Sequence, residues 1–326
     1  MAQISIVIPY YNESQSIVKT LELIESQTVR PITVFLVNSS SRDDSSEKIE
    51  NWIAAKPGRS SLFQNVFAGS DNPGSSKNVG IGLSVTQWVA FMDCGLEFSS
   101  DWLEGQVSYL DRDPSVRWVS GVGEFSGVGV IDHCATTQTY GTMVNRLNIP
   151  SSLISRSAFD QVGPFASKRA GYDVDWAARA ERVGISKHTN SAVRVRYFGV
   201  SFANTLYGVW RKGFTYAKAS VGILGYRRPY RVFIICASGI LLVALAPGIR
   251  VELIAAYVLL RGIAIPTYKC KDLTWTKRNP LMIAPMFVVG AILDISRFLG
   301  LLAGICARTV GGLRKIADRI VSRRRP

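Results

Sequence analysis

The first part of the chain alternates short apolar runs with segments of helical spacing. Residues 4–8 and 32–37 are apolar runs bounded by turn residues, a pattern typical of strands buried on both faces of a parallel sheet. Between them, residues 14–27 carry an apolar side chain every three or four positions, which is helical spacing. The pattern predicts a strand, a helix and a second strand, which is one βαβ unit.

The same alternation continues to residue 92. It predicts a helix over 43–55, a strand over 62–67, a helix that begins in the Gly/Ser/Asn-rich segment 69–76 and runs toward Ser84, and a strand over 88–92. Such alternation is typical of an open α/β sheet flanked by helices. Ligands bind beyond the carboxyl ends of the strands in such sheets, so we expect a site at the loops that begin at Pro9, Asn38 and Asp93.

Later segments extend this domain and then change character. Residues 118–130 are Gly-rich and β-like, residues 150–155 read as a strand before a helix over 157–162, and residues 175–183 are helical. Beyond residue 192, Phe202, Leu206, Trp210 and Phe214 recur at fourfold spacing while Lys and Arg accumulate. This spacing fits an amphipathic helix in a membrane interface and a surface helix packed on the domain equally well.

Three apolar runs follow, at residues 232–247, 251–265 and 281–306. The first two are short for a membrane crossing, which takes about 20 residues, and would suit a tight hairpin through the bilayer. Segments 268–278 and 308–325 are rich in Lys and Arg, so both are expected on the cytoplasmic side. An even number of crossings follows, and one run is then re-entrant or interfacial. Buried core helices are the alternative, which the basic flanks disfavour.

Charge divides the chain into halves of opposite sign. Residues 1–193 hold 16 Lys and Arg against 20 Asp and Glu, a net charge of −4, whereas residues 194–326 hold 22 against 4, a net charge of +18. The basic half is also the apolar half, which favours an anionic membrane surface over nucleic acid as its partner. The five cysteines are too widely spaced for a zinc site and odd in number, which disfavours a disulfide framework, so we expect them to be reduced. The N-terminus lacks the pattern of a signal peptide, which predicts a cytoplasmic catalytic domain.

The loop Pro9-Tyr10-Tyr11-Asn12-Glu13 follows a predicted strand and precedes a predicted helix. Backbone amides and a helix N-terminus at such a place can face the ring or the phosphates of a nucleotide. A capped turn, with Asn12 or Ser14 as the N-cap, explains the same residues.

Asp93 follows directly on a predicted strand and is the candidate ligand for a divalent ion that bridges two phosphates. Mg²⁺ takes phosphate oxygens and waters as ligands, so one or two protein carboxylates suffice, and Glu97 is a candidate second contact. The alternative is that Asp93 caps the turn.

Asp173 and Asp175 lie two residues apart at a predicted helix start, so one of them can point into a site while the other caps the helix or meets solvent. Asp173 is the candidate general base. It would have to lie within about 3 Å of an acceptor hydroxyl. Two carboxylates stabilised by the helix dipole are the alternative.

In their order, these segments resemble the family 2 glycosyltransferases of the GT-A fold over roughly residues 3–220. The similar segments are Ile6 to Glu13, Ser76-Lys77-Asn78-Val79-Gly80, Ile154 to Phe159 with Val162-Gly163-Pro164-Phe165, and Tyr172-Asp173, which aligns with the family's Glu-Asp pair. Three positions depart from the family pattern. Asn38-Ser39-Ser40-Ser41 stands for Asp-Asp-Gly-Ser, Asp93-Cys94-Gly95 stands for Asp-x-Asp, and Tyr172 stands for Glu. A metal-binding His is also not evident near residues 195–198.

The resemblance implies an α/β fold of the GT-A type, an open mixed sheet flanked by helices, followed by interfacial and transmembrane helices. It also implies inversion at the anomeric carbon, with Asp173 as the base and Mg²⁺ or Mn²⁺ at Asp93. The implied donor-binding residues are Pro9, Tyr10, Tyr11, Glu13, Asn38, Ser40, Lys77 and Asp93. The residues expected near the acceptor or the diphosphate are Tyr172, Asp175, Trp210, Arg211 and Lys212. Membrane-surface anchoring is the alternative role for Arg211 and Lys212.

The expected organisation is a catalytic domain over residues 1–200, amphipathic interface helices over 201–230, membrane-embedded helices over 231–306 and a basic cytoplasmic tail over 307–326. We expect a glycosyltransferase on the cytoplasmic face of the inner membrane, with a nucleotide-sugar donor, UDP-sugar favoured, and a polyprenyl-linked acceptor of surface polysaccharide or glycolipid assembly. A processive synthase is disfavoured because too few crossings remain for a channel. A catalytically degenerate membrane scaffold is the alternative from another class, and a nucleic-acid binder is remote.

Overall fold

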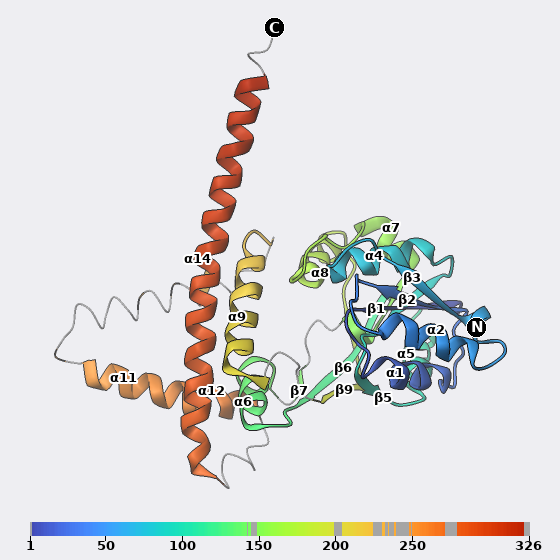
Figure 1. Ribbon diagram of the computed structural model, residues 1–326. Coiled ribbons are helices and arrows are strands. Elements are labelled where there is room, and N and C mark those ends of the chain that lie inside the picture. Colours follow the sequence, from blue (N-terminus) through green and yellow to red (C-terminus); the bar gives the residue numbers. More distant parts are fainter. Residues whose placement is uncertain are drawn as a thin grey trace. The chain divides into compact units, whose positions relative to one another are not determined.

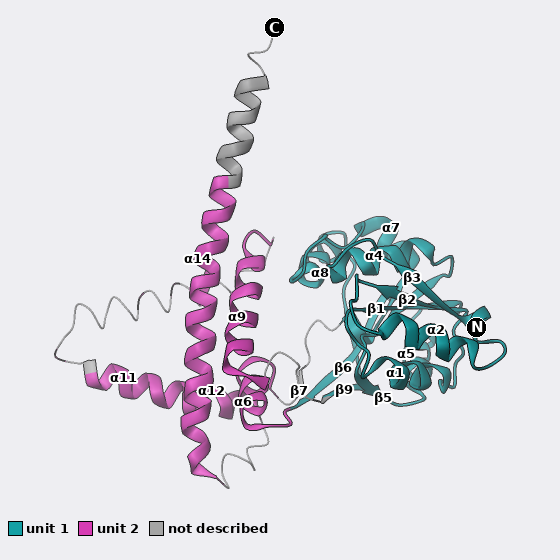
Figure 2. Ribbon diagram, in the orientation of Figure 1, with its two compact units in different colours: residues 1–126, 142–199 teal, residues 127–141, 200–326 magenta. Residues whose placement is uncertain are grey.

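The computed structural model describes residues 2–141, 143–144, 149–198, 204–223, 250–270 and 279–322, with isolated positions between 230 and 248. The chain forms two compact units (Figure 2). Unit 1 comprises residues 1–126 and 142–199, and unit 2 comprises residues 127–141 and 200–326.

Unit 1 is built on a mixed sheet of nine strands in the order β3-β2-β1-β4-β8-β6-β9-β5, with β7 paired to β6 (Figure 1). The strands are β1 (Ile4–Tyr10), β2 (Thr33–Asn38), β3 (Phe63–Phe67), β4 (Trp88–Phe91), β5 (Leu96–Phe98), β6 (Trp118–Ser126), β7 (Met143–Val144), β8 (Ser152–Ser155) and β9 (His188–Phe198). The first four strands are parallel to one another.

The direction of the later strands decides where the chain emerges from the sheet. β8 is antiparallel to both β4 and β6, so β6 runs in the same direction as β4, and β9 is parallel to β6. The carboxyl ends of β1, β2, β4, β6 and β9 therefore lie at one edge of the sheet. We call it the carboxyl edge, and it is where ligands bind in open α/β sheets.

Helices cover both faces of the sheet (Figure 1). One face packs against α1 (Ile17–Glu25), α2 (Ser45–Ala54) and α5 (Trp102–Arg112), and the other against α4 (Pro73–Leu83), α7 (Arg156–Val162) and α8 (Tyr172–Arg182). In β1, Ile6 and Ile8 lie in the first core and Val7 in the second. Burial on both faces explains why this strand is a continuous apolar run.

Unit 2 is helical among the residues described. It contains α6 (Val130–Thr139), α9 (Leu206–Ser220), α11 (Arg250–Leu259), the π-helical η4 (Leu260–Ala264), α12 (Ile265–Lys269), the 3₁₀ turn η5 (Pro280–Met282) and α14 (Ile283–Ser322). Its core joins Cys134 and Ala135 of α6 to Val209 of α9 and to Met286 and Leu293 of α14. The chain thus leaves unit 1 after Ser126 to form α6, and then returns.

Two segments of unit 2 are long and apolar enough to cross a membrane, by length and composition. They are Val251–Lys269, with 19 residues and a mean hydropathy of 1.4, and Pro280–Val310, with 31 residues and a mean hydropathy of 1.9. The predicted apolar runs at 251–265 and 281–306 are therefore helical. The predicted run at 232–247 and the basic segment 271–278 lie almost entirely outside the described residues.

The strands and helices predicted between residues 4 and 92 are confirmed with small shifts at their ends, as are the later ones at 118–126, 152–155, 156–162 and 172–182. The expected N-cap of the first helix is wrong, because Ser16 occupies that position and its side chain makes no capping bond. The predicted interface helix begins at Leu206 and runs to Ser220, while Phe202 lies outside the described residues. The sequence patterns gave no prediction for β5, α5, α6 or β9.

Candidate active site

The segment Ser76-Lys77-Asn78-Val79-Gly80 lies in α4 and makes contacts to several surrounding elements. Ser76 Oγ is 2.7 Å from Ser39 Oγ in the loop after β2. Asn78 binds the backbone of Phe165 twice, donating to its carbonyl at 2.8 Å and accepting from its N–H at 2.9 Å. The segment therefore fixes α4 to the loop after β2 and to the loop before α8.

Lys77 is the buried charge of the site. Its side chain is 1% exposed, and its Nζ donates to Asp93 Oδ1 at 3.1 Å. Asp93 follows β4 at the carboxyl edge, and its side chain is 38% exposed. The Lys77 ammonium also lies 5.4 Å from the centre of the Tyr172 ring, within cation–π range. Lys77 thus connects Asp93 to the start of α8.

Asp173 lies in the first turn of α8, after Gly171 in a left-handed conformation at the N-cap. Burial raises the pKa of its carboxyl group, while the N–H groups of Val174 and of Asp173 itself, and the charge of Lys77, act in the opposite direction. Asp93 raises the pKa of Asp173 slightly further. Both predicted carboxylates therefore lie within electrostatic range of one buried cation.

Asp175 has a different environment from Asp173. It accepts from Arg179 Nε at 3.1 Å, and Arg179 also donates to the carbonyls of Val162 and Pro164, each at 2.6 Å. Asp175 thus orients the arginine that holds α8 to the loop before it. That only one carboxylate of the pair points into a site stays a prediction, as does a role of Asp175 toward the acceptor or the diphosphate.

An aromatic cluster packs against the start of α8. Tyr172 packs edge-on against Phe165, with ring centres 5.7 Å apart, and Phe165 in turn contacts Phe91 and Trp176. Trp176 is fully buried and donates to the Gly163 carbonyl at 2.9 Å. These contacts fix the backbone that carries Asp173.

Hydrogen bonds join the loop after β1 to the loop after β2. The amides of Asn12, Glu13 and Ser14 donate to Ser41 Oγ, Ser45 Oγ and Asp43 Oδ2 at 3.0, 2.8 and 3.1 Å. These amides are satisfied within the protein, so they do not serve as a free cradle for phosphates, contrary to the expectation for this loop. Asn38 Oδ1 accepts from the N–H of Ser41 at 2.8 Å, which stabilises the turn at the end of β2.

The other predicted donor-binding residues differ in exposure. Tyr10 is 2% exposed and donates to Asn65 Oδ1 at 2.7 Å, so it lies in the core beneath the carboxyl edge. Tyr11 is 42% exposed at the end of β1, and Pro9 is partly buried. Ser40 has a φ of 65°, which is unusual for a non-glycine residue and marks a tight turn beside Asn38.

Glu13 is a second acidic group near Asp93. Burial raises the pKa of the Glu13 carboxyl group, and the charges of Asp93 and Asp43 raise it further, while a hydrogen bond from Ser16 lowers it. Glu13 was predicted to bind the donor, but its closeness to Asp93 did not follow from the sequence, because the two residues follow different strands.

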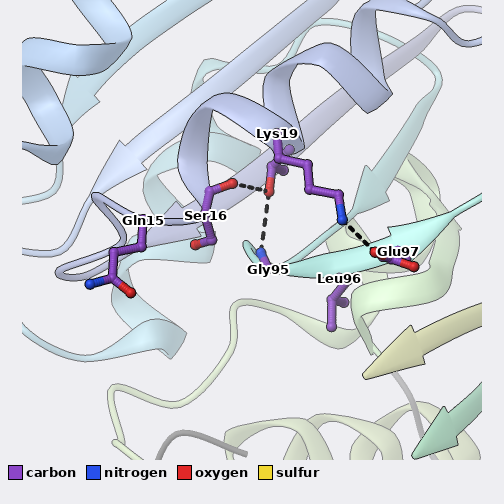
Figure 3. A pocket seen from close by; sticks show the side chains of 7 residues that line it. Gln15, Ser16, Lys19, Gly95, Leu96 and Glu97 are labelled. Atoms are coloured by element: carbon purple, nitrogen blue, oxygen red, sulfur yellow. Dashed lines mark hydrogen bonds and ion pairs between the residues drawn. The ribbon is translucent and has the colours of Figure 1, made fainter. Parts of the chain in front are cut away.

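The ion site predicted at Asp93 has few protein ligands. The described residues hold no group of three or more His, Cys, Asp or Glu that could bind a metal. The candidate second contact, Glu97, pairs with Lys19 across a small cavity of about 160 Å³ (Figure 3). Of the two predicted ligands, Asp93 thus remains as the carboxylate that could hold a divalent ion, and it is shared with Lys77.

Two of the cavities among the described residues are lined by neither Asp93 nor Asp173. The first is the one in Figure 3, formed by α1 and the segment from Gly95 to Glu97. The second, of about 370 Å³, lies at β5 and β9 and is lined by Glu97, Ser99, Arg194 and Arg196, among others. The first is small for a nucleotide-sugar, since ligand pockets usually enclose about 300 Å³ or more.

The predicted residues Trp210, Arg211 and Lys212 belong to unit 2. Trp210 stacks between Tyr207 and Phe214, with ring centres 6.1 and 5.4 Å apart, and the Lys212 ammonium lies 4.1 Å from the centre of the Tyr216 ring. Arg211 is exposed. Their role toward a diphosphate stays a prediction.

A sequence model of glycosyl transferase family 2 matches residues 5–178, more than half of the chain. The chain belongs to this family. Glycosyltransferase AglE of Haloferax volcanii is 27% identical over 194 residues, which cover 56% of this chain and 62% of AglE. The amylovoran biosynthesis glycosyltransferase AmsB of Erwinia amylovora is 28% identical over 109 residues, 33% of this chain and 36% of AmsB. The chain thus spans less than two thirds of these relatives.

A solved structure shares the fold. Mannosyltransferase PcManGT from Pyrobaculum calidifontis, in complex with GDP-Man and Mn²⁺, superposes with a TM-score of 0.58 over 90% of this chain and 87% of its own, at 16% identity. The predicted GT-A type of mixed sheet flanked by helices is thereby confirmed. Lys77, Asp93 and Asp173 lie in the part that the family matches.

Proposed function

We propose that the protein is an inverting glycosyltransferase that moves a sugar from a nucleotide-sugar to a polyprenyl-linked acceptor at the cytoplasmic face of the inner membrane, in surface polysaccharide or glycolipid assembly. The observation that carries the proposal is the placement of Asp93 and Asp173 around the buried Lys77. Membership of glycosyl transferase family 2 supports the chemistry.

In the proposed reaction, the ionised Asp173 takes the proton of an acceptor hydroxyl while that oxygen attacks the anomeric carbon. The bond from this carbon to the diphosphate oxygen breaks, and the nucleoside diphosphate leaves from the opposite face. Asp173 needs to be unprotonated at the start, and Lys77 favours that state. Asn38 and Ser40, at the end of β2, would contact the nucleoside, and a UDP-sugar is the favoured donor.

Asp93 would face the diphosphate. If Mg²⁺ or Mn²⁺ binds, Asp93 is the residue that would hold it, and the ion would supply positive charge against that of the leaving group. The two apolar helices of unit 2 support the proposal that the acceptor resides in a membrane. Arg211 and Lys212 would lie at the membrane surface.

Turnover with a donor panel tests the proposal. Purified full-length protein would be incubated with UDP-glucose, UDP-N-acetylglucosamine or GDP-mannose and a polyprenyl-linked saccharide, and donor binding would be measured by calorimetry. We expect binding and transfer with one donor, and NMR of the product should show the inverted anomeric configuration. Binding without transfer on a broad acceptor panel would support the scaffold alternative instead, which the replacements at Asn38, Gly95 and Tyr172 motivate.

A further inference from the structure

The covalent connections between the two units all start from one edge of the sheet. The chain passes from unit 1 to unit 2 after Ser126, returns before Met143 and passes again after residue 199. Ser126 ends β6, and β9 ends at Phe198 and is parallel to β6. β7 is antiparallel to β6, so its first residue lies at the end of β6. All three connections therefore leave the carboxyl edge, where Asp93 lies.

The side chain of Gln138 links α6, the helix between the first two connections, to the C-terminal helices. Gln138 is fully buried, and its Nε2 donates to the carbonyls of Arg261 and Met286 at 2.6 and 3.0 Å. Its Oε1 accepts from Arg261 at 3.0 Å. The amide thus makes three bonds, all to helices more than a hundred residues further along the chain.

The π-helical turn η4 explains why Gln138 finds an acceptor there. In a π-helix each carbonyl accepts from the amide five residues later. For Arg261 that residue is Pro266, which has no N–H to donate. Gln138 supplies the missing donor to this carbonyl.

Arg261 is in turn fixed by Asp294 of α14. The guanidinium donates to both carboxylate oxygens, with Nε 2.6 Å from Oδ2, and Tyr257 donates to the same oxygen at 3.0 Å. Arg261 and Asp294 are 6% and 9% exposed. A buried ion pair adds little net stability over apolar side chains, but it fixes the relative position of the groups that it joins.

Lys269 holds the last turn of α6 from another direction. It donates to the carbonyls of Gln138 and Thr139, where a positive charge is favourable at a helix C-terminus. Gly141, in a left-handed conformation at φ +81°, lies directly against the Lys269 backbone, and a side chain there would collide with it. The end of α6 is thus held by η4, α12 and α14 together.

We propose that Gln138, Arg261, Asp294 and Lys269, here called the α6 clamp, are positioning residues for transfer to a lipid-linked acceptor. The α6 clamp joins the segment between the first two connections to the apolar helices, and we expect this link to matter for an acceptor held in a membrane. The α6 clamp touches neither donor nor acceptor. This inference rests on the proposed function.

The variant Gln138→Met tests the proposal, because it removes all three amide bonds at nearly constant volume. Thr139→Val is the matched control, since the Thr139 hydroxyl donates to the carbonyls of Ala135 and Thr136 within α6 itself. Two acceptors are compared, a polyprenyl-phosphate saccharide in phosphatidylglycerol vesicles and the same saccharide on citronellyl phosphate, which is soluble. We expect Gln138→Met to lower turnover with the vesicle acceptor on the order of tenfold or more, while the soluble acceptor and donor binding change less than about twofold. Equal losses with both acceptors, or no loss, would overturn the proposal.

A second measurement separates this proposal from the proposed function. Hydrogen exchange of the amides of residues 130–139 in the full chain reports the α6 clamp without any turnover. Protection should fall in Gln138→Met and in Lys269→Met, and remain in Thr139→Val. Lys269 is only partly buried, so its variant serves where Gln138→Met does not fold. If the wild type uses neither acceptor, the proposed function fails, and unchanged exchange in both variants overturns the α6 clamp.

Discussion

Burial and a neighbouring cation act in opposite directions on the pKa of Asp173. Burial favours the protonated carboxyl group, and the Lys77 charge favours the carboxylate that a base needs to be. A general base works best when its pKa lies near the working pH, so a raised pKa suits the proposed role.

Replacing Asp173 with Asn should lower transfer by about 10²–10⁴-fold while donor binding is retained, because the base is lost and the shape is kept. The variant should also be more stable than the wild type near neutral pH. The folded protein binds a proton at Asp173 more tightly than the unfolded chain does, so the wild type loses stability as the pH rises above the ordinary range of Asp. Thermal unfolding at several pH values tests this, with the exposed Asp160→Asn as control. A stability difference that does not grow with pH would contradict it.

Lys77→Met should move the acidic limb of the pH–rate profile to higher pH. Removal of the cation leaves burial and Asp93 as the main influences on Asp173, and both raise its pKa. The profile of kcat/KM reports this pKa in the free enzyme. Lys19→Met is the control, since Lys19 is exposed and pairs with Glu97. An acidic limb that stays in place would show that Asp173 is not the titrating base.

Gly95 stands where the family pattern Asp-x-Asp has its second carboxylate, so a substitution there tests what that carboxylate contributes. Its φ of +74° is one that Asp and Asn adopt more readily than most residues, and an added Cβ would be 3.5 Å from Ser16 Cβ, an ordinary contact. Gly95→Asp should lower the Mn²⁺ concentration for half-maximal transfer on the order of tenfold, because ligand charge sets affinity. Gly95→Asn keeps the shape without the charge and should not. Equal responses would show that charge at this position is irrelevant.

The sequence could identify Asp93, Lys77 and Asp173 as candidates, because each lies in a motif beside a predicted strand or helix. It could not show that Lys77 lies between the two carboxylates, since that depends on how α4 packs against β4 and α8. Nor could it show that Asp175 is engaged by Arg179, or that the amides after β1 are consumed by the loop after β2. Such facts follow from tertiary packing.

At the scale of elements, strands buried on both faces were the easiest to predict. β1 and β2 are continuous apolar runs, because helices cover both sides of the sheet. β9 is different, since Val193 and Val195 point into the core while Arg194 and Arg196 point outward and pair with Glu124. Its outward arginines make the strand look like the start of a basic segment. α6 was not predicted because its buried face includes the polar residues Thr136, Thr137 and Gln138.

Glycines in α4 give a prediction about packing. A Cβ at Gly80 would be 2.5 Å from Cγ1 of the fully buried Val7, whereas one at Gly82 would meet nothing within 4 Å. We expect Gly80→Ala to destabilise the protein by about 1–3 kcal/mol through overpacking. Gly82→Ala should stabilise it by up to about 1 kcal/mol, because Ala favours the helix. Thermal unfolding of both variants compares them directly, and equal shifts would mean that α4 does not approach β1 this closely.

At the scale of the molecule, α14 constrains how unit 2 meets a membrane. It runs as one helix from Ile283 to Ser322, 40 residues or about 60 Å, twice the thickness of a hydrocarbon core. A continuous helix that crosses a bilayer has its ends on opposite sides. The expectation that segments 268–278 and 308–325 both face the cytoplasm therefore requires that α14 does not cross.

The packing of α9 favours an arrangement in which α14 does not cross the membrane. Gly213 and Ser296 are in contact, and Gly304 lies against the Lys218 backbone, so α9 follows α14 within its apolar segment. α9 also exposes Arg211 and Lys218. A charged side chain at the centre of a bilayer costs about 2.5–3.5 kcal/mol even on insertion scales, whereas an interface accommodates it. We therefore expect α14 to lie in the interface, beside α9.

Labelling of single cysteines from one side of the membrane tests this orientation. Leu281→Cys and Val310→Cys, at positions 81% and 49% exposed near the two ends of the apolar segment, would be made in a Cys306→Ser background, which is itself the control. A membrane-impermeant maleimide should label both positions in inverted vesicles and neither in right-side-out vesicles, since an interfacial helix keeps both ends on the cytoplasmic side. Labelling from opposite sides would show that α14 crosses. In that case one of the two basic segments faces away from the cytoplasm, and the charge of α9 would have to be accommodated at bilayer depth by partners within unit 2.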